Sequence, residues 1–510
     1  MSAKVISAAA VGLAGELVEV EVDVLGSGLH AFTIVGLADT AVKESRDRVS
    51  SALKNSGFKP PHQCGRITVN LAPADLPKAS TLYDVPVALG LLLATKQLSF
   101  DIRDKLMVGE LSLDGRIRPV HGVLPLALLA KERGIKEIYV PKENEREASV
   151  VDGLAVIAVG SLEQLVEHLN GRMALEPTEP LVKEEFFGQD SYEVDMCHIK
   201  GQENAKRALE IAAAGAHNVL LSGPPGSGKT LLARAMLSIL PRLTLAEALE
   251  ITKIFSVAGK LGRGESLLRS RPYRAPHHSA SGVSLVGGGT LPRPGEISLA
   301  HRGVLFLDEF GEFSKQVLEN LRQPLEDGMI TISRAKGTLE FPARFTLVAA
   351  MNPCPCGNAT DPERMCVCSG AQLLKYKQKI SGPIMDRIDL HVEVPRLKFE
   401  KLSDDAQGEM SESIRERVER ARGMQKERLK GTSLITNSEM GAKHIKQLCS
   451  LDGESSGILA RAVDSLRLSA RSYHRTIKIA RTIADLAGSE KIQAAHVAEA
   501  LQYRFKTEGS

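Results

Sequence analysis

The chain has 510 residues, a formal net charge of +3, 43% hydrophobic and 25% charged residues, and no tryptophan. Its length suggests about three domains, its composition is ordinary for a globular protein, and its charge is too small to indicate nucleic-acid binding. It contains no run of about 18 apolar residues, which excludes a predicted membrane span.

Residues 1–170 alternate strand-like and helix-like segments. The start has no basic region beyond Lys4 and runs directly into an alternating strand pattern, so we expect no signal peptide. Seven cysteines in a chain this long do not form a secreted disulfide framework, and we expect a cytoplasmic location. Strands are predicted at 17–22, 67–71 and 137–141, and helices at 85–93 and 124–133.

Two stretches of this part, residues 109–117 and 130–135, resemble the proteolytic domain of Lon proteases. The resemblance implies an α+β domain. A Ser–Lys dyad would need a serine near residues 82–85 and a lysine near 123–124, and neither is there; Ser80 and Lys131 are off the pattern. Without a nucleophile and its base, we expect assembly or partner binding rather than proteolysis.

An acidic, proline-rich stretch at 171–190 indicates a linker. It separates the first domain, residues 1–170, from a nucleotide domain at 191–400. From residue 401 to 510 the pattern is helical and charged.

A phosphate-binding loop follows a predicted strand at 218–222 and precedes a predicted helix at 231–240. Its glycines let backbone N–H groups face phosphate oxygens, and the helix N-terminus adds positive potential. We expect Lys229 to reach the β- and γ-phosphates of ATP and Thr230 to ligate Mg²⁺. The loop comprises Gly223, Pro224, Pro225, Gly226, Ser227, Gly228, Lys229 and Thr230.

Two further apolar strands end in polar residues. Residues 303–307 lead into Asp308 and Glu309, where one carboxylate can hold Mg²⁺ and the other can polarise the attacking water. Residues 345–351 lead into Asn352, whose side chain could touch the γ-phosphate and that water.

This ordered set resembles the AAA+ ATPases, an α/β P-loop NTPase core with a C-terminal helical lid. In that resemblance Asn352 is the sensor-1 residue, and Ile199 and Gln202 belong to the segment that packs on adenine. Additional motifs resemble the magnesium-chelatase branch and, together, the bacterial ComM (YifB) family over nearly the whole chain. They lie at 274–278, 287–289, 322–328 and 382–389.

The resemblance implies two arginines that act on nucleotide. Arg387 matches the arginine finger, which clamps developing phosphate charge in a neighbouring subunit; the alternative is a structural arginine paired with Asp386 or Asp389. Arg471 matches the sensor-2 arginine of the lid, and Arg475, one helical turn on, is the alternative. A finger acting in trans implies a ring, by family resemblance a hexamer.

Two C-x-C pairs follow Asn352 closely and can supply four thiolates to a tetrahedral Zn²⁺ site. In a reducing compartment, metal binding is favoured over disulfide formation. Free thiols and a redox pair are the alternatives. The residues are Cys354, Cys356, Cys366 and Cys368.

Basic side chains gather at 263–293, the expected character of a DNA-backbone contact inside a ring. A second candidate is a hairpin at 329–341 that resembles the one this AAA+ branch inserts, with Arg334 and Lys336 near its tip. Salt bridges at subunit interfaces are the alternative for both. The basic residues of the first segment are Arg269, Arg271, Arg274, His277, His278 and Arg293.

The resemblance therefore implies an ATP-driven ring motor on single-stranded or branched DNA, with branch-migration or helicase activity in homologous recombination and natural transformation. Two alternatives stay open. One is the ATPase subunit of a metal chelatase, and the other is an ATP-dependent protein remodeller.

Overall fold

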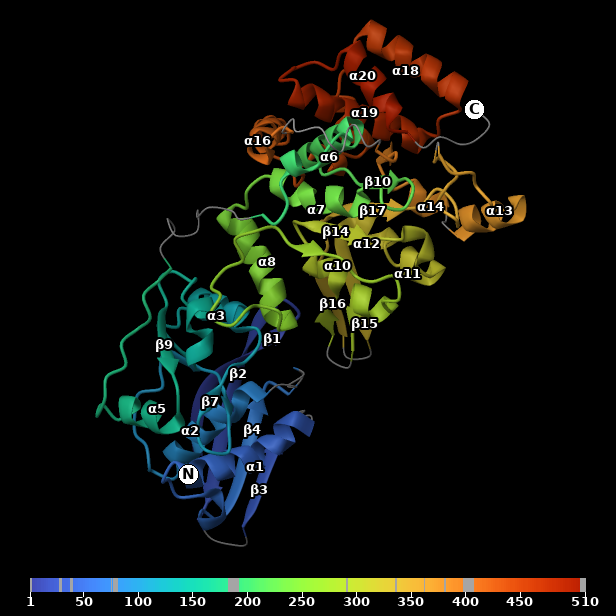
Figure 1. Cartoon of the computed structure of the whole chain (residues 1–510). Coiled ribbons are helices and arrows are strands. Elements are labelled where there is room, and N and C mark those ends of the chain that lie inside the picture. The colour runs from blue at the N-terminus through green and yellow to red at the C-terminus, as the bar shows by residue number, and fades with distance from the viewer. Residues whose placement is uncertain are drawn as a thin grey trace.

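The computed structural model describes residues 2–26, 30–36, 40–74, 76, 81–181, 192–289, 292–334, 337–361, 363–379, 382–397 and 408–504. Figure 1 shows an N-terminal lobe, an ATPase core and a cap of C-terminal helices. Within the described residues, no helix combines the length and the apolarity that crossing a bilayer would need.

The N-terminal lobe packs three sheets, one of them the short pair β6 (Glu110–Leu111) and β7 (Ile117–Arg118), and several helices around one apolar core. The largest sheet has the order β1-β2-β4-β3, with only β3 and β4 parallel. Its strands are β1 (Ser2–Val11), β2 (Ala14–Leu25), β3 (Ala31–Val35) and β4 (Arg66–Ala72). The second sheet is parallel, with β5 (Lys105–Met107), β8 (Glu137–Pro141) and β9 (Ala155–Val159). Helices of the lobe include α1 (Thr40–Asn55), α2 (Asp84–Ala94), α3 (Val123–Glu132) and α5 (Leu162–Leu169).

The positions where a Ser–Lys dyad was sought hold core residues. Val85, Val123 and Leu124 are buried. Asp84, also buried, accepts hydrogen bonds from Arg48 Nε at 2.7 Å and Nη2 at 3.0 Å. Burial raises the pKa of the Asp84 carboxyl, although the Arg48 hydrogen bonds oppose that shift. Ser80 lies outside the described residues. The structure thus places an ion pair between Asp84 and Arg48 here. That the lobe serves assembly or partner binding rather than proteolysis stays a prediction.

The first half of the predicted linker lies along the N-terminal lobe. Thr178 N donates to Val156 O at 2.8 Å, and Leu181 N donates to Ser149 O at 3.2 Å. Residues 182–191 lie outside the described residues. These two hydrogen bonds hold this part of the predicted linker against the lobe, and the domain boundary at residue 170 stays a prediction.

The ATPase core is built on a five-stranded sheet of order β11-β14-β17-β10-β18, parallel throughout. The predicted strands at 218–222, 303–307 and 345–351 are confirmed within one residue. In a parallel sheet the carboxyl ends share one edge, so the polar residues that follow these strands come together. The strands are β10 (Val219–Ser222), β11 (Tyr273–Arg274), β14 (Val304–Leu307), β17 (Thr346–Met351) and β18 (Leu390–Glu393).

Helices from distant parts of the chain cover one side of this core. Helix α6 (Glu203–Gly215) packs against α7 (Lys229–Ile239), α16 (Ser411–Arg428) and α19 (Ala470–Leu486), and they share one apolar cluster. The other C-terminal helices are α17 (Ala442–Leu448), α18 (Gly453–Leu466) and α20 (Ala494–Gln502). The C-terminal helices are therefore not a detached unit.

Short elements are inserted between the strands. The predicted hairpin is present as β15 (Met329–Arg334) and β16 (Gly337–Pro342), and it projects away from the C-terminal helices (Figure 1). The side chains at its tip, including Arg334 and Lys336, lie outside the described residues. The remaining helices here are α8 (Leu245–Ala258), α9 (Gly282–Val286), α10 (Glu296–Leu299), α11 (Lys315–Glu319), α12 (Arg322–Asp327), α13 (Gly370–Lys379) and α14 (Gly382–Met385).

Helix α8 joins the ATPase core to the N-terminal lobe, as Figure 1 shows beside α3. Gly122 N donates to Ser256 O at 3.2 Å, and the Ser256 hydroxyl donates to the buried Glu147 carboxylate. Local sequence patterns gave no sign of this contact, because it joins residues more than 100 positions apart.

Candidate ATPase site

The phosphate loop runs from β10 directly into α7, as the motif predicts. Gly228, immediately before the helix, has φ of +92°, a conformation that favours glycine. Lys229 Nζ donates to Gly223 O at 2.7 Å and to Pro224 O at 2.9 Å, and it lies 3.4 Å from Asn352 Oδ1. Burial lowers the pKa of Lys229, and the nearby Asp308 opposes that shift. The ammonium and the polar end of β17 therefore meet within one site.

The predicted magnesium ligands are in contact. Thr230 Oγ1 donates to Asp308 Oδ2 at 2.9 Å, and Asp308 Oδ1 accepts from the Glu309 amide at 2.9 Å. A hydroxyl and a carboxylate oxygen are the ligand types that Mg²⁺ uses in nucleotide sites. These residues fit that ion, with Glu309 one residue farther along the chain.

The two residues predicted near adenine are both buried, but they make different contacts. Gln202 Nε2 donates to Pro395 O at 2.7 Å and lies 3.4 Å from Ser227 O, so it joins the start of α6 to the phosphate loop. Ile199 is buried within the apolar core. Their contact with adenine stays a prediction.

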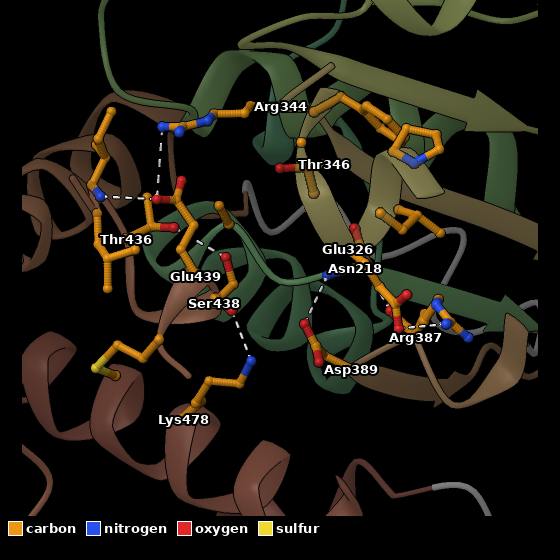
Figure 2. A pocket seen from close by; sticks show the side chains of 18 of the residues that line it. Asn218, Glu326, Arg344, Thr346, Arg387, Asp389, Thr436, Ser438, Glu439 and Lys478 are labelled. Atoms are coloured by element: carbon orange, nitrogen blue, oxygen red, sulfur yellow. Dashed lines mark hydrogen bonds and ion pairs between the residues drawn. The ribbon is translucent and has the colours of Figure 1, made fainter. Parts of the chain in front are cut away.

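The predicted finger and sensor-2 arginines lie at the opposite edge of the sheet. Arg387 comes just before β18, among the amino ends of the strands, and its guanidinium donates to Glu326 (Figure 2). Arg471 of α19 donates to the same Glu326 oxygen. The Arg387 side chain is 7% exposed and that of Arg471 is 47% exposed. One carboxylate therefore holds both arginines.

Both arginines, and the sensor-2 alternative Arg475, have partners within the chain, so their roles stay predictions. Arg387 pairs with Glu326, whereas Asp389 accepts from His217 and the Asn218 amide. Arg475 is buried and donates to Ile388 O at 2.7 Å, so it braces the turn before β18. Arg471 and Arg387 line a cavity of about 520 Å³ between the core and the C-terminal helices, seen from close by in Figure 2.

The four cysteines of the C-x-C pairs converge. The Sγ atoms lie 3.4 Å apart for Cys354 and Cys356, 3.6 Å for Cys356 and Cys366, and 3.7 Å for Cys354 and Cys366. All four Sγ atoms, including that of Cys368, lie within 4.8 Å of one another. Zn–S bonds of about 2.3 Å give a tetrahedron with edges of about 3.8 Å. The set fits a tetrathiolate zinc site.

The cysteine loop contacts the phosphate loop. A Cβ placed on Gly357 would lie 2.5 Å from Pro225 Cδ, so only glycine fits this approach. Backbone N–H groups of Asn358 and Val367 lower the pKa of Cys356 to about 6, which favours the thiolate form that binds metal. A metal here would rigidify the segment between Asn352 and the phosphate loop.

The basic segment at 263–293 divides into two groups. The Arg271 side chain is 13% exposed and contacts Glu247 and the carbonyls of Pro241 and Arg302, and Arg274 pairs with Glu296 at 2.6 Å. Both guanidinium groups are therefore engaged by carboxylates of the same chain, and their contact with DNA stays a prediction. Arg269, His277 and Arg293 remain exposed.

The sequence did not predict the contacts that two residues make at this site. Glu326 falls in a family-like motif, but its link to both arginines spans 61 and 145 residues. His278 stood out only as a basic residue, and its Nδ1 lies 2.9 Å from Glu309 Oε2. In the sequence these two residues are marked only by the motifs at 322–328 and 274–278. A motif does not indicate which side chains its residues contact.

Comparisons with known proteins agree along the chain. Three family models match: "Magnesium chelatase, subunit ChlI" at residues 195–402, "Subunit ChlI of Mg-chelatase" at 19–144, and "Magnesium chelatase, subunit ChlI C-terminal" at 408–504. The chain is 46% identical to Competence protein ComM of Haemophilus influenzae, over 98% of this chain and 97% of that protein. It is 42% identical to YifB of Escherichia coli, over 97% and 96%. Lon protease 2 of Bacillus subtilis is 27% identical over 30% of each chain.

Proposed function

The chain belongs to the ComM (YifB) family of magnesium-chelatase-like AAA+ ATPases, and on that premise we propose that it is a ring-forming motor that uses ATP hydrolysis to move DNA branches during recombination and natural transformation. Family membership implies an ATPase that uses ATP and Mg²⁺. The action on DNA is the proposal, supported by the competence name of the Haemophilus relative and by the basic segment beside Glu309.

The site performs hydrolysis with residues from three strand ends. Lys229 and the loop amides would bind the phosphates, and Thr230 and Asp308 would hold Mg²⁺, which supplies positive charge to the transferred phosphate. Glu309 accepts the proton of the attacking water, as a carboxylate beside the metal site can. Asn352 lies at the end of β17, 3.4 Å from the Lys229 ammonium. From there its side chain would contact the γ-phosphate of bound ATP.

A second subunit completes this site. The phosphate loop lies at the carboxyl ends of the parallel strands, and Arg387 and Arg471 lie at the amino ends. The four residues of β18 alone separate these edges by about 13 Å. Both arginines therefore serve the nucleotide of a neighbour, and a head-to-tail contact of this kind closes into a ring. By resemblance to the family, we propose that the ring has six subunits.

The observation that carries the DNA assignment is the direct contact between the basic segment and the hydrolytic residue. His278 of that segment touches Glu309, and Arg269, His277 and Arg293 are exposed on the same segment. Exposed cations facing a ring interior suit a phosphate backbone. Substrate binding and hydrolysis then share one structural element.

The four cysteines hold a structural Zn²⁺ in this proposal. The fit rests on the distances between the Sγ atoms. Because four thiolates would fill all four coordination positions of Zn²⁺, the ion would rigidify the loop and would not bind substrate. Reduced cysteines of this kind support a cytoplasmic location. The N-terminal lobe, with its buried Asp84–Arg48 pair, serves assembly or partner binding.

The second candidate is an ATPase subunit of a metal chelatase, favoured by the family descriptions that name that enzyme. It would act through a partner protein that handles the metal and its acceptor, and DNA would leave its ATPase unchanged. A protein remodeller would respond to unfolded polypeptide instead.

One ATPase assay tests the proposal. Turnover is measured without additives, with single-stranded DNA, with forked DNA and with an unfolded polypeptide, at low salt where backbone binding is strongest. We expect DNA to stimulate turnover and Lys229→Ala to abolish it. No response to either DNA at low salt would overturn the proposal, and a response to polypeptide alone would favour the remodeller.

A further inference from the structure

We propose that the N-terminal lobe braces the hairpin of β15 and β16, with Leu13 in the β1–β2 turn as the positioning residue, and that DNA stimulates hydrolysis only while this brace is intact. The inference rests on the proposed function for the action of DNA. The brace itself can be tested without DNA.

The turn between β1 and β2 carries a leucine at its tip. Val11 pairs with Ala14, so the turn consists of Gly12 and Leu13 alone. Gly12 has φ of +61°, as the first position of a two-residue hairpin turn favours. Glycine and polar residues usually fill such turns, because the tip of a hairpin faces water. Leu13 is instead half-buried, which indicates that another part of the chain covers it.

The ATPase core covers Leu13. Its side chain packs against the apolar cluster that includes Ile332 and Phe341 of the hairpin, both of them buried. A Cβ placed on Gly12 would lie 3.5 Å from Leu339 Cδ2 of β16, which is van der Waals distance. The turn of the N-terminal lobe therefore lies directly against the hairpin, which projects toward that lobe in Figure 1.

The same end of β1 is also held near α8. A Cβ placed on Gly122, the residue before α3, would lie 3.1 Å from Ala10 Cβ and 3.8 Å from Val257 Cγ2 of α8. Gly122 N also donates to Ser256 O of that helix. Since β1 pairs with β2 along its whole length, the turn is the end of a stiff ribbon. The lobe thus contacts the core at α8 and at the hairpin.

The hairpin in turn supports the basic segment. Within that segment, β12 (Gly287–Gly288) pairs with β13 (Arg293–Pro294). A Cβ placed on Gly287 would lie 3.3 Å from Ile332 Cδ1 of β15, and β13 also contacts α8. The two parts of the chain that are predicted to contact DNA therefore pack on each other, and the N-terminal lobe contacts both α8 and the hairpin that support them.

The brace acts on the coupling between DNA and hydrolysis. Lys229 holds the phosphate loop, and Thr230 contacts Asp308, through hydrogen bonds that do not involve the hairpin. Loss of the brace leaves these contacts in place, so hydrolysis without DNA should continue. A hairpin that shifts freely would no longer hold the basic segment in register with the strand ends. Binding of a phosphate backbone would then have less effect on turnover.

The first test measures ATP turnover. Leu13→Ser removes the apolar side chain and keeps the turn, and Leu13→Ala serves should Leu13→Ser fail to fold. We expect kcat without DNA to stay within about twofold of wild type and stimulation by forked DNA to fall about five- to tenfold, the effect of losing the apolar contact of one half-buried leucine. Leu13→Met, which refills the same space, should keep wild-type stimulation.

The second test measures hydrogen exchange by mass spectrometry without DNA. The amide hydrogens of β15 and β16 should exchange faster in Leu13→Ser than in wild type, at an unchanged rate in β10. Leu113→Ser is the matched control, because Leu113 is a leucine of the same lobe, 58% exposed in the turn between β6 and β7. It should behave as wild type in both tests.

Unchanged hairpin exchange in both Leu13→Ser and Leu13→Ala would overturn the brace. Full stimulation by DNA in a variant whose hairpin exchanges faster would overturn it as well. If DNA fails to stimulate the wild-type protein, the proposed function fails, whereas faster hairpin exchange in the variants still supports the brace.

Discussion

Mixed rings test whether each site is shared between two subunits. Subunits carrying Lys229→Ala and subunits carrying Arg387→Ala should each be inactive alone and recover ATP turnover when they are mixed. Lys229 lies at the carboxyl ends of the sheet and Arg387 at the amino ends, about 13 Å away along β18. Each variant therefore damages a different half of the site.

The size of the recovery follows from this geometry. An interface is intact only where the Arg387→Ala subunit supplies the loop and the Lys229→Ala subunit supplies the arginine. With equal amounts and random assembly, roughly one quarter of interfaces meet this condition, so we expect roughly a quarter of wild-type turnover. Arg387→Ala alone should lose about 10³-fold or more in kcat, the range for an arginine that stabilises phosphoryl transfer.

Phosphate release at saturating Mg-ATP measures the recovery, and gel filtration shows that the mixed subunits elute together. A subunit with both substitutions is the matched control, since it supplies neither half when mixed with Lys229→Ala. Mixed rings without recovery would refute the shared site. So would an Arg387→Ala protein with near wild-type turnover.

Three further variants probe contacts in other parts of the protein. Glu326→Ala frees Arg387 and Arg471 from their common carboxylate and should lower kcat about tenfold or more with a smaller change in KM; unchanged steady-state kinetics would show that Glu326 does not orient them. A protein with Cys366→Ser and Cys368→Ser should lose the one zinc per chain measured by atomic absorption in wild type, and wild-type protein without zinc would contradict the site. Asp84→Ala removes the buried carboxylate that accepts hydrogen bonds from Arg48 and should lower the free energy of unfolding of the N-terminal lobe by about 3–5 kcal/mol, so an unchanged melting curve would argue against that pair.

Much of the ATPase core could be predicted because its signals are local. Buried parallel strands are short apolar runs, and their ends are marked by polar residues that chemistry requires. The predicted strand at 345–351 is β17 (Thr346–Met351), and the helix predicted from 231 begins two residues earlier, at Lys229. Order along the chain then placed Asp308 and Asn352 at the same edge as the loop.

The partners of charged residues could not be predicted from the same patterns. Arg271 and Arg274 have the character of DNA contacts in sequence, but their carboxylate partners lie 24 and 22 residues away. Only the fold determines which basic side chains form ion pairs with carboxylates of the same chain. The same reason hid the contact of His278 with Glu309, since one residue precedes β14 and the other follows it.

Conversion of a labelled DNA fork by the purified protein with Mg-ATP tests the central claim most directly. We expect the branch to move in the presence of ATP and to stay in place with Lys229→Ala, at matched protein and salt concentrations. The account would be contradicted if DNA did not change the rate of ATP hydrolysis at low salt and the wild-type protein left the branch in place.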